Sequence, residues 1–248
     1  MYLVVTRIGT TFRPVVRHPI SDVAGHPSTP PVGRQLVSRC RGAAVSPCGG
    51  GTVRSMSPPT LPVTGDAEAD KLLIDNPLAL MIGMLLDQQV PMEWAFGAPL
   101  RLKERLGGRL DATEVAAGDP AELEKIFRGP PALHRYPGSM AKRTHALCQH
   151  LVEHHGGDAA AVWAGVDDGR ELLRRVKALP GYGTEKAKIF TALLAKRFGV
   201  RPAGWEQATA PFSDDQPRSV ADIDSAETLQ RVRSWKKAMK AEGRSKSD

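Results

Sequence analysis

Apolar residues recur at helical spacing along most of the chain from residue 66 onward. The densest run, residues 78–87, is apolar on nearly every side, which predicts a helix that is buried all round. Asn76 can cap this helix, and Pro77 suits its first position. Because no segment signals paired strands, the pattern predicts an all-α fold. Further helices are predicted within residues 66–74, 92–106, 119–127, 139–152, 171–178, 187–198 and 225–240.

A very short, glycine-rich turn joins two of these helices, and residues 179–188 read LPGYGTEKAK. Pro180 cannot continue the first helix, and Gly181 and Gly183 can adopt the positive φ values of a tight reversal. Thr184 is placed to cap the second helix. We therefore expect two helices joined by a hairpin turn.

This hairpin is suited to binding phosphate. With no side chain at either glycine, a backbone phosphate can approach the N–H groups at the start of the second helix. Lys186 and Lys188 would add positive charge nearby. The alternative is a plain structural turn, because glycine-rich turns between helices are common.

The hairpin sequence, L-P-G-x-G followed by an alanine-containing helix, resembles the helix-hairpin-helix of the base-excision DNA glycosylases related to endonuclease III. The resemblance covers about residues 66–212 and is most specific at the hairpin. It implies two helical lobes with a groove between them, double-stranded DNA as partner, and hydrolysis of the bond between a damaged or mismatched base and its sugar. The alternative is a non-catalytic DNA-binding protein that has lost the catalytic acid.

Glycosylases of this family rotate the target base out of the duplex and fill the gap with a side chain. That side chain follows an apolar helix ending in a glutamine-containing turn. Gln89 matches the position and Gln88 precedes it, so both amides are candidate gap-filling residues; the alternative is that they only cap the helix end. Lys142 and Arg143, in the helix before the hairpin, could contact phosphate or form a solvated basic face.

The resemblance also implies a catalytic carboxylate just beyond the second hairpin helix, which would stabilise positive charge on the sugar or activate water. Most members have aspartate there, whereas this chain has no aspartate before Asp214. Glu206 is the acid at about the right distance, with Asp214 and Asp215 as fallback candidates. Trp205 would line a base pocket or act as a hydrophobic plug.

Some members use a lysine early in the second hairpin helix to form a Schiff base and cut the strand. The ungapped match places Glu185 at that position, with Lys186 one residue further and so about 100° round the helix. The resemblance therefore favours a monofunctional glycosylase.

The net charge of the chain does not by itself indicate DNA binding by the folded part, because most of that charge lies near the N-terminus. The formal net charge is +7, but residues 1–55 hold seven arginines and one acid, Asp22, so the rest of the chain is nearly neutral. DNA affinity of the folded part must then come from a local basic patch. Residues 1–55 lack periodicity and predict a disordered basic extension. They are either a segment upstream of a true start at Met56 or a tail that contacts DNA.

Composition excludes several other classes of site. Three scattered cysteines form neither a disulfide framework nor a zinc pattern, and no four-cysteine iron–sulfur loop follows Cys148. His150 and His154 lie one helical turn apart without an obvious third ligand, so neither metal nor cofactor is expected. No apolar run reaches the roughly 18 residues of a membrane span. A monomeric, cytoplasmic, nucleoid-associated protein is expected.

The chain is thus predicted to have three parts. Residues 1–55 form the extension, residues 56–212 a helical glycosylase-like core, and residues 213–248 an amphipathic helix and tail packed on that core. In the last helix, the residues expected to face inward are Leu229, Val232, Trp235 and Met239.

Overall fold

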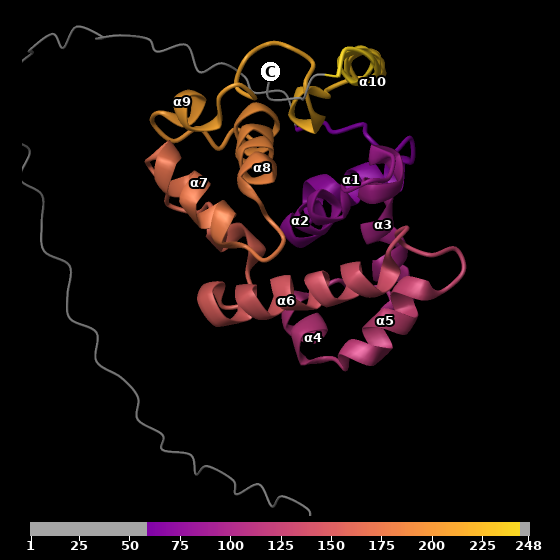
Figure 1. Ribbon diagram of the computed structural model, residues 1–248. Helices are drawn as coiled ribbons and strands as arrows, with labels where there is room; N and C mark the ends of the chain where they lie inside the picture. The colour runs from indigo at the N-terminus through magenta and orange to yellow at the C-terminus, as the bar shows by residue number, and fades with distance from the viewer. Residues whose placement is uncertain (1–58, 244–248) are drawn as a thin grey trace, which may run out of the picture. The chain divides into compact units, whose positions relative to one another are not determined.

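The structure is a computed structural model that describes residues 59–243 (Figure 1). The expectations for residues 1–55, for a start at Met56 and for the last residues of the tail lie outside this range. Residues 59–243 form ten α-helices and two short 3-10 helices, and their one strand-like contact is an isolated bridge between Asp168 and Ala203. The all-α prediction is confirmed.

The helices largely follow the predicted pattern, and α4 and α9 were not predicted. In chain order the α-helices are α1 (Ala67–Asp75), α2 (Pro77–Leu86), α3 (Met92–Arg105), α4 (Ala112–Ala117), α5 (Pro120–Arg128), α6 (Pro137–His155), α7 (Gly169–Ala178), α8 (Thr184–Arg197), α9 (Trp205–Thr209) and α10 (Ala226–Ala241). The 3-10 helices are η1 (Ala159–Val162) and η2 (Val220–Asp222).

Local sequence explains where several helices begin. Asp66 and Asn76 cap α1 and α2, each with a side-chain oxygen that accepts two backbone N–H groups of the first turn. Ser225 caps α10 in a capping box. A serine at position 139 suggests a cap for the following helix, but α6 already begins at Pro137, so Ser139 lies inside its first turn. Proline suits the first helical position because the N–H that it lacks would have no partner there.

Helix α2 lies at the centre of the packing. Nine of its ten residues are buried, which confirms the prediction of a helix apolar on nearly every side. It packs against α1, α3, α6 and η1, while α4 and α5 lie on α6. Helices α7, α8 and α9 pack on one another, and η2 links α8 to α10 (Figure 1). The helices thus form two groups, one around α2 and α6 and one around α8.

Residues after 212 pack onto the earlier helices through ion pairs as well as apolar contacts. Lys196 on α8 pairs with Asp222 at 2.6 Å, and both side chains are largely buried. Arg233 on α10 pairs with Glu93 on α3. Of the predicted inward-facing residues of α10, Leu229 and Val232 are buried and Trp235 and Met239 are half-buried.

Alanine substitutions at two helical glycines, Gly83 and Gly97, distinguish the effect of close packing on stability from the effect of helix propensity. A Cβ on Gly83 of α2 would lie 2.7 Å from Cδ1 of the buried Phe96, whereas a Cβ on Gly97 of α3 would meet open space. We predict that Gly83→Ala lowers the free energy of unfolding by about 1–3 kcal/mol through overpacking. Gly97→Ala should raise it by about 0.5–1 kcal/mol, because alanine favours the helix. Chemical denaturation of both variants measures the changes, and equal stabilities would contradict the described contact of α2 with α3.

Candidate functional site

The predicted hairpin joins α7 to α8. The Tyr182 N–H donates to the Leu179 carbonyl at 3.0 Å, and Gly181 has the positive φ, 85°, that the reversal requires. Gly183 differs from the prediction, because its φ is −72° and it forms the N-cap of α8. Thr184 is therefore the first residue of α8 and not its cap, since the extended backbone of Gly183 already occupies the N-cap position.

The hairpin is fixed to α2 by hydrogen bonds to the middle and the end of that helix. The buried Tyr182 hydroxyl donates to the Met81 carbonyl at 2.8 Å, and burial raises the pKa of Tyr182 well above its ordinary value. The Lys186 ammonium donates to the Leu85 carbonyl at 2.7 Å. A Cβ on Gly181 would lie only 2.3 Å from Cδ1 of Leu85. The turn and α2 therefore form one tightly packed unit.

The start of α8 is open. No side chain caps it, and the first N–H groups of an α-helix have no partners within the helix. Gly183 and Thr184 are exposed, and a Cβ on Gly183 would meet nothing within 4 Å. The partial positive charge of a helix start favours anions, so this end of α8 can accept a phosphate.

The two hairpin lysines both bind backbone carbonyls. Lys186 donates to α2 as described, and Lys188 donates to the Ala210 carbonyl at 2.8 Å. Their charges stay near the turn, but both ammonium groups are oriented by the protein. Phosphate binding at the hairpin therefore depends first on the open N–H groups of α8.

A cavity of about 410 Å³ lies between the C-terminal end of α2 and the hairpin. Its volume falls within the range of small-molecule sites. Apolar, polar and charged residues all contribute to its lining. Its lining residues are Met84, Asp87 and Gln88 on the α2 side, and Gly181, Gly183, Thr184, Glu185, Lys186 and Ile189 on the hairpin side.

The two candidate gap-filling amides differ in how they are held. Gln88 is engaged at both ends, because its Nε2 donates to the Leu85 carbonyl and its Oε1 accepts from Arg143, each at 2.8 Å. Gln89 is exposed and has a positive φ of 55°, which is uncommon for a residue with a side chain. Its Oε1 accepts a hydrogen bond of 3.3 Å from the Tyr136 hydroxyl. The structure therefore gives Gln88 a structural role and leaves Gln89 at the surface.

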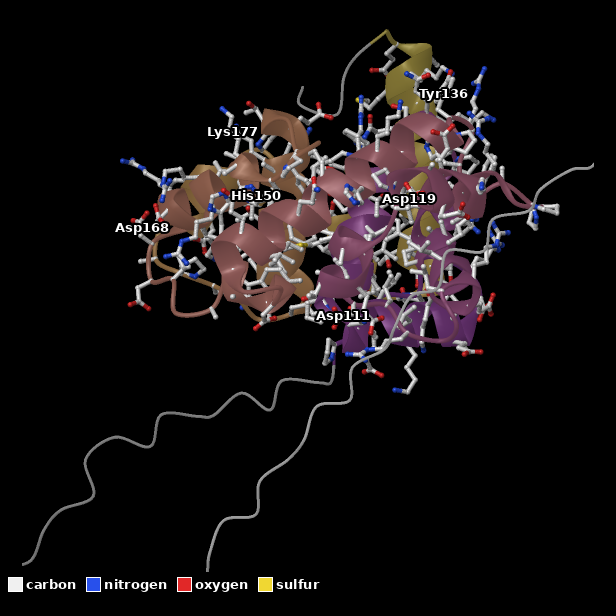
Figure 2. All side chains as sticks on the ribbon, turned by 90° about the horizontal axis from the view of Figure 1, so that it is seen from below. Asp111, Asp119, Tyr136, His150, Asp168 and Lys177 are labelled. Carbon is white, nitrogen blue, oxygen red and sulfur yellow. The ribbon has the colours of Figure 1, made fainter. Side chains whose placement is uncertain are left out.

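The turn carrying these amides is supported by residues that precede α6. His134 is buried and its Nδ1 accepts the Tyr136 N–H at 3.0 Å, so the proton lies on Nε2, which donates to the Gln88 carbonyl at 3.0 Å. Burial lowers the pKa of His134, which favours the neutral ring. Figure 2 shows Tyr136 at the start of α6, with His150 further along the helix. The sequence did not predict these supports, because 46 positions separate His134 from Gln88.

The predicted catalytic residues Trp205 and Glu206 are not among the residues that line the hairpin cavity. Trp205 is buried, and a Cβ on Gly169 would lie 2.5 Å from the Trp205 backbone. Gly169 begins α7 and the hairpin follows its end, which puts the start of α9 roughly 15 Å along α7 from the turn. Glu206 is exposed and does not line the hairpin cavity.

Trp205 lines a second cavity of about 380 Å³, together with basic and acidic residues that include Lys196, Arg201 and Asp222. Asp215 lines this second cavity as well. Asp214 pairs with Arg218 at 2.9 Å. Neither fallback acid lines the hairpin cavity.

Metal and membrane sites are not found in the part of the chain that the structure describes. The rings of His150 and His154 lie 4.4 Å apart between centroids, but no group of three or more His, Cys, Asp or Glu residues in 59–243 could hold a metal ion. No helix in this range is both long and apolar enough to cross a bilayer.

An all-α fold with a glycine hairpin packed on a buried helix defines a helix-hairpin-helix protein. The chain belongs to the HhH-GPD superfamily of base excision DNA repair proteins, whose family model matches residues 82–247. A solved structure of endonuclease III, trapped as a covalent intermediate with DNA in an estranged-adenine complex, is similar at 21% identity and a TM-score of 0.36, covering 66% of this chain and 73% of that chain. A comparison with curated proteins finds no match.

The two amides should respond differently to truncation. We predict that Gln88→Ala lowers the free energy of unfolding by about 1–3 kcal/mol, because it removes two hydrogen bonds, one of them to the charged Arg143. Gln89→Ala should change stability by less than about 0.5 kcal/mol, as is usual at exposed positions. Urea denaturation of the pair measures this difference. A Gln89→Ala variant as unstable as Gln88→Ala would contradict the structural role of Gln88 and the surface position of Gln89.

Proposed function

We propose that the protein is a DNA glycosylase of base excision repair, which extrudes a damaged or mismatched base from double-stranded DNA and hydrolyses its bond to the sugar. The observation that carries this proposal is the cavity bordered on one side by the open start of α8 and on the other by the Gln88–Gln89 turn. Membership of the base excision repair superfamily supports it. We propose further that the protein acts as a cytoplasmic monomer on the nucleoid.

The hairpin would hold a DNA phosphate. An approaching phosphate meets the N–H groups at the start of α8, with Gly183 leaving room and Thr184 supplying a hydroxyl. Lys186 and Lys188 would add attraction through their charge rather than through direct contact, since both bind carbonyls. Such a grip fixes the register of the duplex without reading its sequence.

Gln89 would enter the space left by the extruded base. Extrusion costs a few kcal/mol of pairing and stacking, so a residue that occupies the gap favours the extruded state. Gln89 is suited to this role because it is exposed at the tip of the turn, while Gln88 behind it is fixed by Arg143 and by His134. The extruded nucleoside would then enter the cavity beside the hairpin.

Bond hydrolysis requires a carboxylate near the sugar, because positive charge develops there as the base departs. The family pattern has aspartate in that role, and Glu206, with Trp205 beside it, is the acid of this chain at about the matching distance. In the structure Glu206 is exposed and absent from the hairpin cavity, and Trp205 is buried against α7. The Glu206 assignment therefore stays a prediction of the sequence resemblance.

The phosphate grip can be tested separately from the chemistry. We predict that Gly183→Val weakens binding to a duplex about tenfold to 100-fold, because a branched side chain keeps phosphate from N–H groups whose charge-assisted bonds contribute about 1.5–3 kcal/mol. The variant should stay folded, since the added Cβ meets open space. Fluorescence anisotropy at several salt concentrations measures the affinity, with Gly97→Ala as a control remote from the hairpin. Unchanged binding by Gly183→Val would contradict the role of the hairpin.

Base release tests the proposed function itself. Wild-type protein is incubated with duplexes that carry uracil, oxidised, alkylated or mismatched bases, and free base is measured by mass spectrometry. Release from at least one duplex is expected. Salt-sensitive DNA binding without release from any of them would instead favour the alternative, a DNA-binding protein without catalytic activity.

The same substrates test whether the protein also cuts the strand. Lys186 is the lysine that lines the cavity, and its ammonium is bound to the Leu85 carbonyl. We predict that borohydride traps no covalent protein–DNA adduct, as expected of a monofunctional enzyme. An adduct that forms with the wild type and is lost in Lys186→Ala would show that Lys186 attacks the sugar.

A further inference from the structure

Two carboxylates, those of Asp87 and Glu185, line the hairpin cavity. If the cavity receives an extruded nucleoside, as the proposed function requires, these are the acids that line the space it would occupy. The position and surroundings of each residue show which of them has a structural explanation.

Asp87 sits where a carboxylate is unfavourable for the fold. It is the C-cap of α2, and its N–H donates to the Gly83 carbonyl at 3.1 Å. The C-terminal end of a helix carries partial negative charge, so an acid there is destabilising and a cation is stabilising. Asp87 is half-buried, and no hydrogen bond or ion pair of its carboxylate is seen within residues 59–243. The fold gains nothing evident from this acid.

Glu185 has an ordinary structural explanation. It lies in the first turn of α8, where the partial positive charge of the helix start stabilises an acid, and it is exposed. Glu206, the acid that the sequence indicates, does not line the cavity. Asp87 is therefore the carboxylate in the cavity without a structural explanation.

The surroundings of Asp87 hold its backbone firmly. The Lys186 ammonium binds the Leu85 carbonyl two residues before Asp87, which offsets part of the charge at this helix end. Gln88, the next residue, is fixed by Arg143 and by the buried His134. A group held on a rigid support can keep the geometry that catalysis requires.

We propose that the Asp87 carboxylate, and not that of Glu206, faces the sugar of the extruded nucleoside. As the bond between C1′ and the base nitrogen breaks, its electron pair leaves with the base and positive charge develops on the sugar. The carboxylate stabilises that charge and accepts a proton from the water whose oxygen bonds to C1′. The proton then passes to the departing base, so Asp87 is regenerated as the carboxylate.

A binding experiment tests this without requiring turnover. One duplex carries a pyrrolidine in place of the target sugar, and the protonated ring nitrogen of this pyrrolidine resembles the positively charged sugar. A second duplex carries the neutral tetrahydrofuran analogue at the same position. Wild type should bind the pyrrolidine duplex about 100-fold more tightly than the tetrahydrofuran duplex, which is the lower end of the affinity gain seen for transition-state analogues. Asp87→Asn should bind both duplexes about equally, and Glu206→Gln should keep the wild-type preference.

Stability and base release complete the test. Asp87→Asn should be at least as stable as wild type, because it removes an acid from the end of α2, yet its single-turnover base release should fall by about 100-fold or more. A destabilised Asp87→Asn would contradict the charge argument. If Asp87→Asn keeps both the preference and the base release while Glu206→Gln loses them, the Asp87 proposal fails and the glycosylase function stands. If wild type releases no base and shows no preference for pyrrolidine, the proposed function fails, and the Asp87 proposal fails with it.

Discussion

The arrangement of the site depends on one buried hydrogen bond, from the Tyr182 hydroxyl in the hairpin to the Met81 carbonyl in α2. Together with the Lys186 bond to Leu85, it holds the hairpin against the end of the most buried helix. Because interiors are close-packed, a helix buried on all sides is a rigid reference for whatever it carries. The open start of α8, the cavity and the amide turn are therefore positioned by a single element.

Two features at the edge of this rigid unit are unfavourable for folding. Gln89 has a positive φ, and Asp87 places negative charge at the C-terminal end of α2. Each conflict is local, and the surrounding bonds of Gln88 to Arg143 and His134 hold the turn in place. Residues whose conformation or charge is locally unfavourable tend to concentrate at functional sites. We therefore propose functional roles for Gln89 and Asp87.

Most of the fold could be predicted from the sequence, but only part of the site. The periodicity of α2 and the cap at Asn76 are local signals, and the structure has them where they were predicted. The prediction that Thr184 caps α8 was wrong, because Gly183, with an ordinary negative φ, is itself the N-cap. The contact of His134 with Gln88 spans 46 positions, which no local pattern encodes. Asp87 did have a local signal, an acid at the wrong end of a helix, but its place in the cavity depends on tertiary packing.

The central claim is that the cavity between α2 and the hairpin receives the extruded nucleoside. A crystal structure of the protein bound to a duplex with a single tetrahydrofuran abasic site tests it most directly. We predict a phosphate bound by the N–H groups at the start of α8, the Gln89 side chain within the duplex, and the abasic sugar in the cavity with C1′ facing Asp87. A complex in which the hairpin contacts no phosphate and the abasic sugar lies outside this cavity would contradict it.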